Sequence, residues 1–238
     1  MIPEIDWSAP WLAPYRARGQ VLHRRWQAGA SVAEALNGAD AEAAMPRFVP
    51  QAELPAGEGY EAFIRRSGRV PTRDNLHDFF NGLVWLHRPA LKARLNAWHG
   101  LEAQRGPPQE AGPQRGPLRD ALTLLDENGA LLHDAPPALA QALIERDWRR
   151  LFIELRPLWR GVRLEIVGHA LLEKLQAPRK PICAHVLLAE PQDPRALAAK
   201  PFLPLPVLGL PGWWAANEDP GFYEDAAVFR PGRALQTG

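Results

Sequence analysis

One segment of the sequence carries a histidine among carboxylates at a spacing that suits catalysis. Asp74, His77, Asp78 and Asn81 recur at intervals of three or four residues. A helix turns 100° per residue, so these four side chains would share one narrow stripe. A carboxylate beside an imidazole orients the ring and raises its basicity, which general acid–base catalysis requires. We expect His77 to act as general base, oriented by Asp74 or Asp78; the alternative is a polar stripe that caps the helix and faces water.

The position of Trp85 favours a stripe that is covered. This indole falls in the middle of the polar positions, where a solvated helix face usually carries small or charged side chains. The opposite face is apolar and comprises Leu76, Phe79, Phe80, Leu83, Val84 and Leu86. The pattern predicts an amphipathic helix whose polar side lies under another part of the chain.

A second histidine stands one helical turn before a carboxylate. His169 and Glu173 are separated by four residues, a spacing that suits a shared metal ion or a hydrogen-bonded pair. Gly168 precedes the histidine and permits a close turn from strand to helix. The alternative is a buried histidine whose ring is satisfied by a neighbouring carbonyl.

Arginines and aromatic residues flank these segments. Arg73 precedes the first segment, and Arg119 with Asp120 lies farther along the chain. Guanidinium groups that converge on one site bind phosphate or carboxylate substrates, and we assign Arg73, Asn81, Arg119, Asp120 and Trp214 as candidate substrate contacts. The alternative is that these arginines are ordinary surface charge. The aromatic residues of the C-terminal segment either anchor it to the core or cover the polar stripe.

Composition excludes several classes of protein. The 238 residues carry a net charge of +1, so no overall field favours nucleic acid or an anionic membrane. The single cysteine, Cys183, cannot form an internal disulfide. The N-terminal residues lack the basic and apolar pattern of a secretory signal, and no apolar stretch approaches the roughly 20 residues of a membrane span. These features predict a cytoplasmic protein without membrane insertion.

Motifs for common cofactors are missing from the sequence. It contains no Gly-rich phosphate loop, dinucleotide fingerprint, nucleophile elbow or His-Glu-x-x-His pattern. Nucleotide cofactors and serine-hydrolase chemistry therefore lose their usual support. A divalent metal stays possible, because imidazole and carboxylate groups are metal ligands.

Local patterns predict a helix-rich α+β fold with a small, mostly antiparallel sheet. We expect a single domain, 1–238, with a helical part at 1–44, a core at 45–200 and an irregular Pro/Trp-rich tail at 201–238. Asn128-Gly129 predicts a β-hairpin over residues 121–132. Ser31 is expected to cap a helix, as is Thr72 or Asp74. Further helices are expected near 60–66, 89–105, 136–156 and 168–176, strands at 162–167 and 182–188, and a loop at 106–116.

Four segments in this order resemble a bacterial family of uncharacterised proteins, the domain of unknown function numbered 3025. They are VPTRDNLHDFFN (70–81), RGPLRDALTLLDENG (115–129), GHALLEKL (168–175) and LPGWW (210–214). The resemblance covers most of the chain and is weakest at 104–114. It implies a bacterial, cytoplasmic protein, and it assigns no catalytic residue.

Two functions are consistent with the sequence. The first is a hydrolase of a small anionic or polar substrate, which requires the segments at 74, 119 and 168 to converge; a separation of His77 and His169 beyond about 12 Å would exclude it. The second is a non-catalytic binding or adaptor protein that uses its aromatic tail and arginines, which a large exposed aromatic patch would favour. A metal-dependent phosphohydrolase built on His77 and Asp78 is a narrower third possibility, without the additional upstream histidines that such sites usually need.

Overall fold

The computed structural model describes residues 2–38, 46–104 and 116–232. Its helices are α1 (Arg16–Gln27), α2 (Val32–Asn37), α3 (Tyr60–Ser67), α4 (Leu76–His87), α5 (Pro89–Gln104), α6 (Pro117–Asn128), α7 (Pro137–Glu145), α8 (His169–Lys174) and α9 (Pro194–Ala198). Its strands are β1 (Arg47–Pro50), β2 (Arg69–Thr72), β3 (Gly129–His133), β4 (Arg163–Ile166), β5 (Cys183–Leu187) and β6 (Leu203–Pro206). The predicted helix-rich α+β class is confirmed.

The strands form two small sheets. β1 pairs with β2 in parallel, and the larger sheet has the order β4-β3-β5-β6. In the larger sheet β3 runs antiparallel to β4 and parallel to β5, and β5 runs antiparallel to β6. The parallel pair is possible because a long connection between β3 and β5 contains β4 and α8. The sheet is therefore mixed, with two antiparallel pairings and one parallel pairing.

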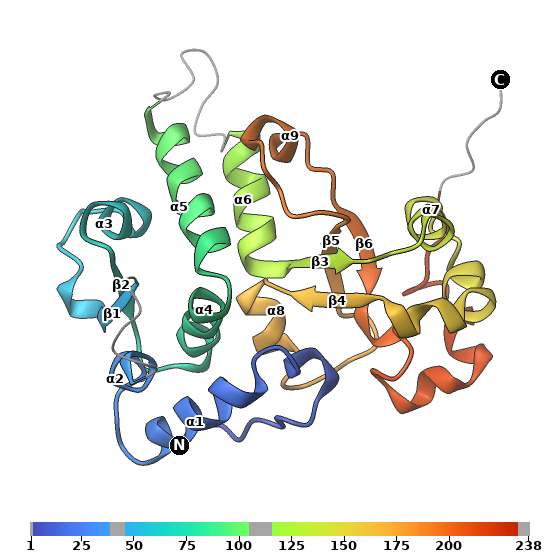
Figure 1. Cartoon of the computed structure of the whole chain (residues 1–238), viewed down its shortest axis with the longest axis horizontal. Coiled ribbons are helices and arrows are strands. Elements are labelled where there is room, and N and C mark those ends of the chain that lie inside the picture. Colours follow the sequence, from blue (N-terminus) through green and yellow to red (C-terminus); the bar gives the residue numbers. More distant parts are fainter. Residues whose placement is uncertain (1, 39–45, 105–115, 233–238) are drawn as a thin grey trace.

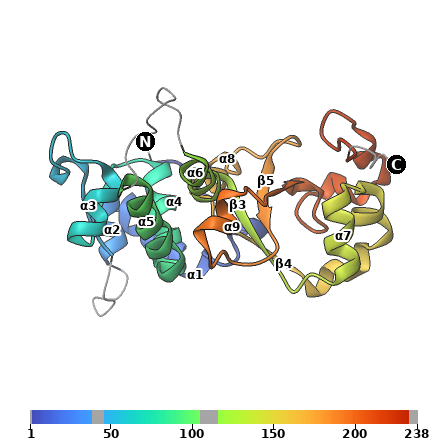
Figure 2. The same cartoon turned by 90° about the horizontal axis from the view of Figure 1, so that it is seen from above.

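Helices α4, α6 and α8 meet near the middle of the molecule. Helices α2 to α5 and the β1–β2 pair gather at one end, and α7 and the C-terminal segment lie at the other (Figure 1). Figure 2 shows the same order from above, with α6 and α8 between the two ends. Both α4 and α6 pack against α8. This junction brings together residues from three distant parts of the sequence.

The hairpin expected over residues 121–132 is wrong. Residues Pro117–Asn128 form α6, and the chain then enters β3 directly. Leu118, Ala121, Leu122 and Leu125 are buried, and their i, i+3, i+4, i+7 spacing is the period of a helix that covers a core. Gly129 has a φ of −79°, so the positive φ of a tight hairpin turn is not used. The helical period therefore prevails over the local turn signal.

Two predictions about helix capping have different outcomes. Ser31 caps α2 and forms a reciprocal capping box with Glu34, as expected. For α4 the cap is Asn75 rather than Thr72 or Asp74, and the Asn75 side chain accepts the Asp78 N–H at 2.8 Å. An asparagine carbonyl satisfies a free N–H as well as a hydroxyl or carboxylate does. The Asp74 side chain does not cap α4 and forms a hydrogen bond with another part of the chain.

The region 136–156 is not one continuous helix. Helix α7 ends at Glu145, and the next residue, Arg146, has a left-handed φ of 55°. A short π-helical turn over Arg150–Glu154 and a 3₁₀ segment over Arg156–Gly161 follow. A non-glycine residue in the left-handed region ends a regular helix, and the prediction placed the end of the helix too late.

The C-terminal segment contains more regular structure than expected. It begins with β6, whose two prolines lie in a strand at the edge of the sheet, where an absent N–H leaves no pairing unmet. Short 3₁₀ turns follow, and Tyr223 and Phe229 are buried against Phe152. The expected role of the aromatic residues as anchors is confirmed. The loop expected at 106–116 lies almost entirely outside the described residues.

A buried carboxylate joins α4 to the larger sheet. Glu165 on β4 is fully buried. Its oxygens accept from His87 Nε2 at 3.1 Å and His133 Nε2 at 2.8 Å, and Arg88 lies 3.4 Å away. Burial opposes ionisation, but the hydrogen bond from His87, the charge of Arg88 and the hydrogen bond from His133 together lower the Glu165 pKa to about 2. The ionised carboxylate fixes the end of α4 against β3 and β4.

Within the described residues, no helix combines the length and the apolar composition that a bilayer crossing demands.

Candidate metal centre

Three side chains from three helices converge at the central junction. His77 lies on α4, Glu127 on α6 and His169 on α8. The Nε2 atoms of His77 and His169 are 3.0 Å apart, and Glu127 Oε2 lies 3.8 Å from His169 Nε2. One ligand atom from each of these residues lies within 4.8 Å of the others. The separation of the two histidines is well inside the limit that a shared site requires.

Glu173 controls which nitrogen of His77 carries the proton. His77 Nδ1 lies 2.8 Å from Glu173 Oε2. An ionised carboxylate only accepts hydrogen bonds, so Nδ1 donates and Nε2 presents a lone pair toward His169. Histidines that bind metals in proteins are commonly oriented by a carboxylate on their other nitrogen. The expected His169–Glu173 pair is thus replaced by a His77–Glu173 pair.

His169 is held in its neutral form. Its side chain is 6% exposed, and burial lowers its pKa to about 4, although Asp126 opposes this shift. The buried Nδ1 has no hydrogen-bond partner among the described residues, and Asp126 Oδ2 lies 3.8 Å away. A neutral imidazole is the form that binds a metal ion.

Lys92 on α5 lies beneath the junction and compensates Asp126. Its ammonium group donates to Asn81 Oδ1 at 2.8 Å and also to Asp126 Oδ1. The same group lies 5.4 Å from the centre of the Trp85 ring. Asp78, Asn81 and Trp85 are all buried, so this part of the polar stripe is covered, as the position of the indole indicates. Asp74 is exposed and His77 is half-buried.

Glu127 faces the solvent side of the junction. Its side chain is 36% exposed, and partial burial raises its pKa, although the nearby cations, including Lys174, oppose the shift. Lys174 Nζ donates to Asn128 Oδ1 at 2.6 Å, next along the chain. The junction therefore has a carboxylate and an ammonium group at its accessible edge.

Gly168 permits the close contact between two turns that carry the site. A β-carbon at this position would lie 2.5 Å from Gly129 N and 2.6 Å from Asn128 N. The Gly168 N–H donates to Gly129 O at 2.8 Å. Since the φ of Gly168 is −76°, the requirement for glycine is the available space and not the backbone angle. The turn before His169 is therefore packed directly on the end of α6, next to Glu127.

Replacing Gly168 by alanine is expected to lower the free energy of unfolding by about 1–3 kcal/mol, since the added methyl group must displace backbone atoms. The change would also move His169 away from Glu127. Urea denaturation measures the loss. Gly161→Ala is a matched control, because no atom lies within 4 Å of its added β-carbon; equal effects of the two substitutions would contradict the packing argument.

The carboxylates expected to orient His77 have other contacts. Asp74 Oδ1 accepts the Val32 N–H at 2.7 Å, which joins α4 to the start of α2. Asp78 pairs with Arg73 through both its carboxylate oxygens. Each of these groups has a structural contact, so the closest carboxylates to the two histidines come from α6 and α8 instead.

The remaining predicted substrate contacts are spread over the molecule. Arg119 and Asp120 lie near the start of α6, roughly 10 Å along the helix axis from Glu127. Asp120 pairs with Lys200 at 3.1 Å. Trp214 is half-buried in the C-terminal segment and packs against the core. Asn81 is buried beside Lys92, and Arg73 is paired with Asp78.

Sequence reasoning missed Asp126, Glu127 and Lys92. Both acids lie at the turn of the hairpin that was incorrectly expected over residues 121–132. The helical period of Leu118, Ala121, Leu122 and Leu125 would have placed both acids in the last turn of a helix. Lys92 is one of several polar residues in α5, and nothing in the sequence distinguishes it as a buried one.

Comparison with known proteins identifies a family but no characterised relative. The family described as "Protein of unknown function (DUF3025)" matches residues 46–197 and 188–233. No curated protein and no solved structure matches the chain. His77, Glu127 and His169 all lie within the matched residues. Because the match covers most of the sequence, the chain belongs to the DUF3025 family of proteins of unknown function.

Proposed function

We propose that this protein is a metal-dependent hydrolase of a small anionic or polar substrate, with His77, Glu127 and His169 as metal ligands. The observation that carries the proposal is the convergence of two imidazole nitrogens and one carboxylate oxygen within 4.8 Å. Two histidines and a carboxylate are the ligands of many catalytic zinc sites. The same ligands also bind Fe²⁺ in oxygenases, and the experiments below separate these ions.

The distances support a shared ion. Two nitrogens at the usual Zn–N length on a tetrahedral centre are roughly 3.3 Å apart, and the two Nε2 atoms are 3.0 Å apart. The ring centroids are 4.4 Å apart and the planes are inclined by 77°, so the rings do not meet head-on as a linear hydrogen bond prefers. A small movement of the Glu127 side chain completes the ligand set.

The residues around the three ligands preorganise them for metal binding. Glu173 keeps the proton of His77 on Nδ1, burial keeps His169 neutral, and Lys92 compensates the adjacent Asp126. Carboxylates that contact ligating histidines raise the affinity of metal sites. These features prepare both Nε2 atoms to bind an ion at neutral pH.

The exposure of the site favours catalysis over a purely structural role. The side chain of His77 is 32% exposed and that of Glu127 is 36% exposed. Structural zinc sites use four protein ligands, whereas catalytic sites use three and leave a position for water or substrate. A bound ion would lower the pKa of its water to about 7 and supply the nucleophile for hydrolysis. Lys174, at the accessible edge, would attract an anionic group of the substrate.

The adaptor alternative has less support. Large hydrophobic side chains that are exposed among the described residues are Val21, Leu101, Ile144, Leu158 and Leu188. None of them is aromatic, so the exposed aromatic patch that would favour an adaptor is not found in the described part of the chain.

Metal binding is tested first, on the native protein and on three variants. We expect about one Zn²⁺ or Co²⁺ per native chain by elemental analysis, and raised melting temperatures when either ion is added. His77→Ala and His169→Ala are expected to lose this binding, and Glu127→Gln is expected to weaken it at least tenfold, in the range reported for changes around metal sites. Glu154→Gln is the matched control, because Glu154 is 55% exposed and pairs with Arg149, which is also exposed.

Hydrolysis is tested with chromogenic phosphate and carboxylate esters. The native protein should lose activity when a chelator removes the ion and regain it when Zn²⁺ is returned. A native protein that neither retains nor responds to any divalent ion would refute the metal centre. If the protein binds one metal ion per chain but hydrolyses none of these esters, the proposed hydrolase activity would be refuted. The protein would then be a metal-binding protein only.

A further inference from the structure

A second hollow shares no residue with the candidate metal centre. Its volume is about 370 Å³. It is lined by Pro10, Ala13, Pro14, His87, Trp159, Val162, Arg163, Leu164, Leu210, Pro211 and Trp213. Small-molecule sites commonly enclose roughly 300–1,000 Å³. The hollow is therefore large enough for a compact organic molecule.

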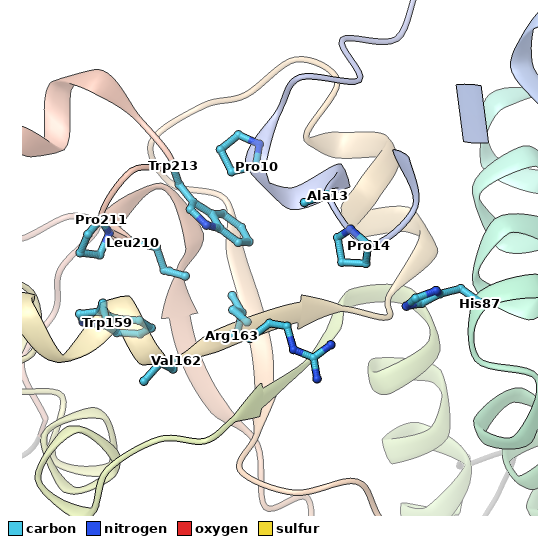
Figure 3. Close-up of a pocket in the computed structure, with 11 residues that line it drawn as sticks. Pro10, Ala13, Pro14, His87, Trp159, Val162, Arg163, Leu210, Pro211 and Trp213 are labelled. Atoms are coloured by element: carbon cyan, nitrogen blue, oxygen red, sulfur yellow. The ribbon is translucent and has the colours of Figure 1, made fainter. Parts of the chain in front are cut away.

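One end of the hollow is apolar and rigid. Figure 3 shows the indoles of Trp159 and Trp213 with Leu210 and Val162 on the same side. Trp159 Nε1 donates to a backbone carbonyl at 2.9 Å, and the Trp213 ring packs 6.0 Å from that of Trp11. These contacts fix the two indoles before any ligand binds, which lowers the entropy lost on binding.

A tight turn in the C-terminal segment places Trp213. The Trp213 N–H donates to Leu210 O at 3.0 Å, and Gly212 has a φ of 78°. Proline at the second position and a glycine with positive φ at the third are features of a type II turn. The LPGWW segment, which the candidate metal centre does not use, thus builds one wall of the hollow.

The other end carries the guanidinium group of Arg163. Arg163 is 57% exposed, and its nearest carboxylate oxygen, on Glu165, is 3.8 Å away. Glu165 already accepts from His87 and His133. No hydrogen bond from the Arg163 guanidinium to another described residue is found. Its donors are therefore free for a ligand.

The local charge balance favours an anion. Arg88 pairs with both Glu165 and Glu190, and Arg94 also pairs with Glu190. These four residues do not line the hollow; among the residues that do, Arg163 carries the positive charge and none is acidic. A planar guanidinium binds a carboxylate through two parallel hydrogen bonds.

We propose that this hollow binds a small carboxylate with an aromatic or branched apolar body. The apolar body lies against Trp159 and Trp213, and the carboxylate pairs with Arg163 (Figure 3). His87 lines the same end, but its Nε2 is engaged by Glu165, so the charge recognition depends on Arg163. The proposal is independent of the metal centre, since the two sites share no residue.

Isothermal titration with 2-naphthoate and its neutral analogue 2-naphthamide tests the proposal. The two probes have the same ring system and differ in charge. Native protein should bind the acid at least tenfold more tightly than the amide, in line with a charge-assisted hydrogen-bond pair. Arg163→Gln should remove this difference. Arg160→Gln is the matched control, because Arg160 is exposed nearby and does not line the hollow.

Trp213→Leu should weaken the binding of both probes and keep the preference for the acid. Near-ultraviolet circular dichroism establishes that each variant is folded. The proposal is overturned if native protein binds neither probe with a saturable isotherm, binds both equally, or retains its preference in Arg163→Gln. If Arg163→Gln does not fold, the comparison of acid and amide on the native protein still decides the question.

Discussion

Glu165→Gln is expected to lower the free energy of unfolding at pH 7 by about 3–5 kcal/mol, because it removes the buried negative charge that His87, His133 and Arg88 share. Glu165 is fully buried and accepts from both His87 and His133. An amide offers one acceptor oxygen where the carboxylate offers two. Urea denaturation of the native and variant proteins measures the loss.

The pH dependence of the same variant provides an independent check. The native Glu165 pKa is about 2, below the ordinary value of 4.5. Its stabilisation is therefore complete above pH 4.5 and is lost as the pH falls toward 2, by about 3 kcal/mol in total. Glu165→Gln lacks this component and should show a shallower loss of stability over that window.

Glu58→Gln is the control for Glu165→Gln. Glu58 pairs with Arg66, whose side chain is 60% exposed, and an exposed ion pair contributes little to stability because solvent screens it. If Glu165→Gln cost no more than Glu58→Gln, the proposed role of Glu165 in fixing α4 on the sheet would be refuted.

Lys92→Met is expected to destabilise the protein by a similar amount, about 3–5 kcal/mol at pH 7. Methionine keeps the length of the apolar stem but removes the ammonium group that contacts Asn81 and Asp126. Burial alone would raise the pKa of Asp126. In the native protein the positive charges of Lys92 and the histidines have the larger effect and hold this pKa below its ordinary value. Without Lys92 the Asp126 carboxylate, which is 22% exposed, would lose the ammonium group that pairs with it beside His169.

Two measurements separate this mechanism from a simple packing defect. The double variant Lys92→Met/Asp126→Asn removes both charges and should recover most of the lost stability. The loss of stability in Lys92→Met should also become smaller as the pH is lowered toward 5. In this variant burial is no longer opposed by Lys92 and raises the pKa of Asp126, so the carboxylate is protonated more readily and its charge is removed. A deficit that persists unchanged in both experiments would show that packing alone is lost.

The sequence predicted the elements that depend on local interactions. The capping box at Ser31 and the helices around His77 and after Pro89 depend on contacts within a few residues. Apolar periodicity and proline position specify such elements directly. The predictions that failed involved competing local signals, as in α6, where Asn128-Gly129 favoured a turn and the apolar period favoured a helix.

Burial of polar residues could not be predicted from the same patterns. In β4 the alternation of Arg163, Leu164, Glu165 and Ile166 predicts that the acid faces water, yet Glu165 is fully buried. It lies beneath residues from α4 and β3, which are distant in sequence. Alternation identifies the two faces of a strand, but it does not show whether other elements cover the polar face.

The sequence by itself indicated a helix with His77 on its polar stripe, and a close turn at Gly168 before His169. Only the tertiary structure decided which groups surround them. His77 and His169 are 92 residues apart in the chain, and their carboxylate partners come from the ends of α6 and α8 rather than from Asp74 and Asp78. The physical reason is that spacing along a helix fixes the direction of a side chain, whereas its partner depends on the packing of distant segments.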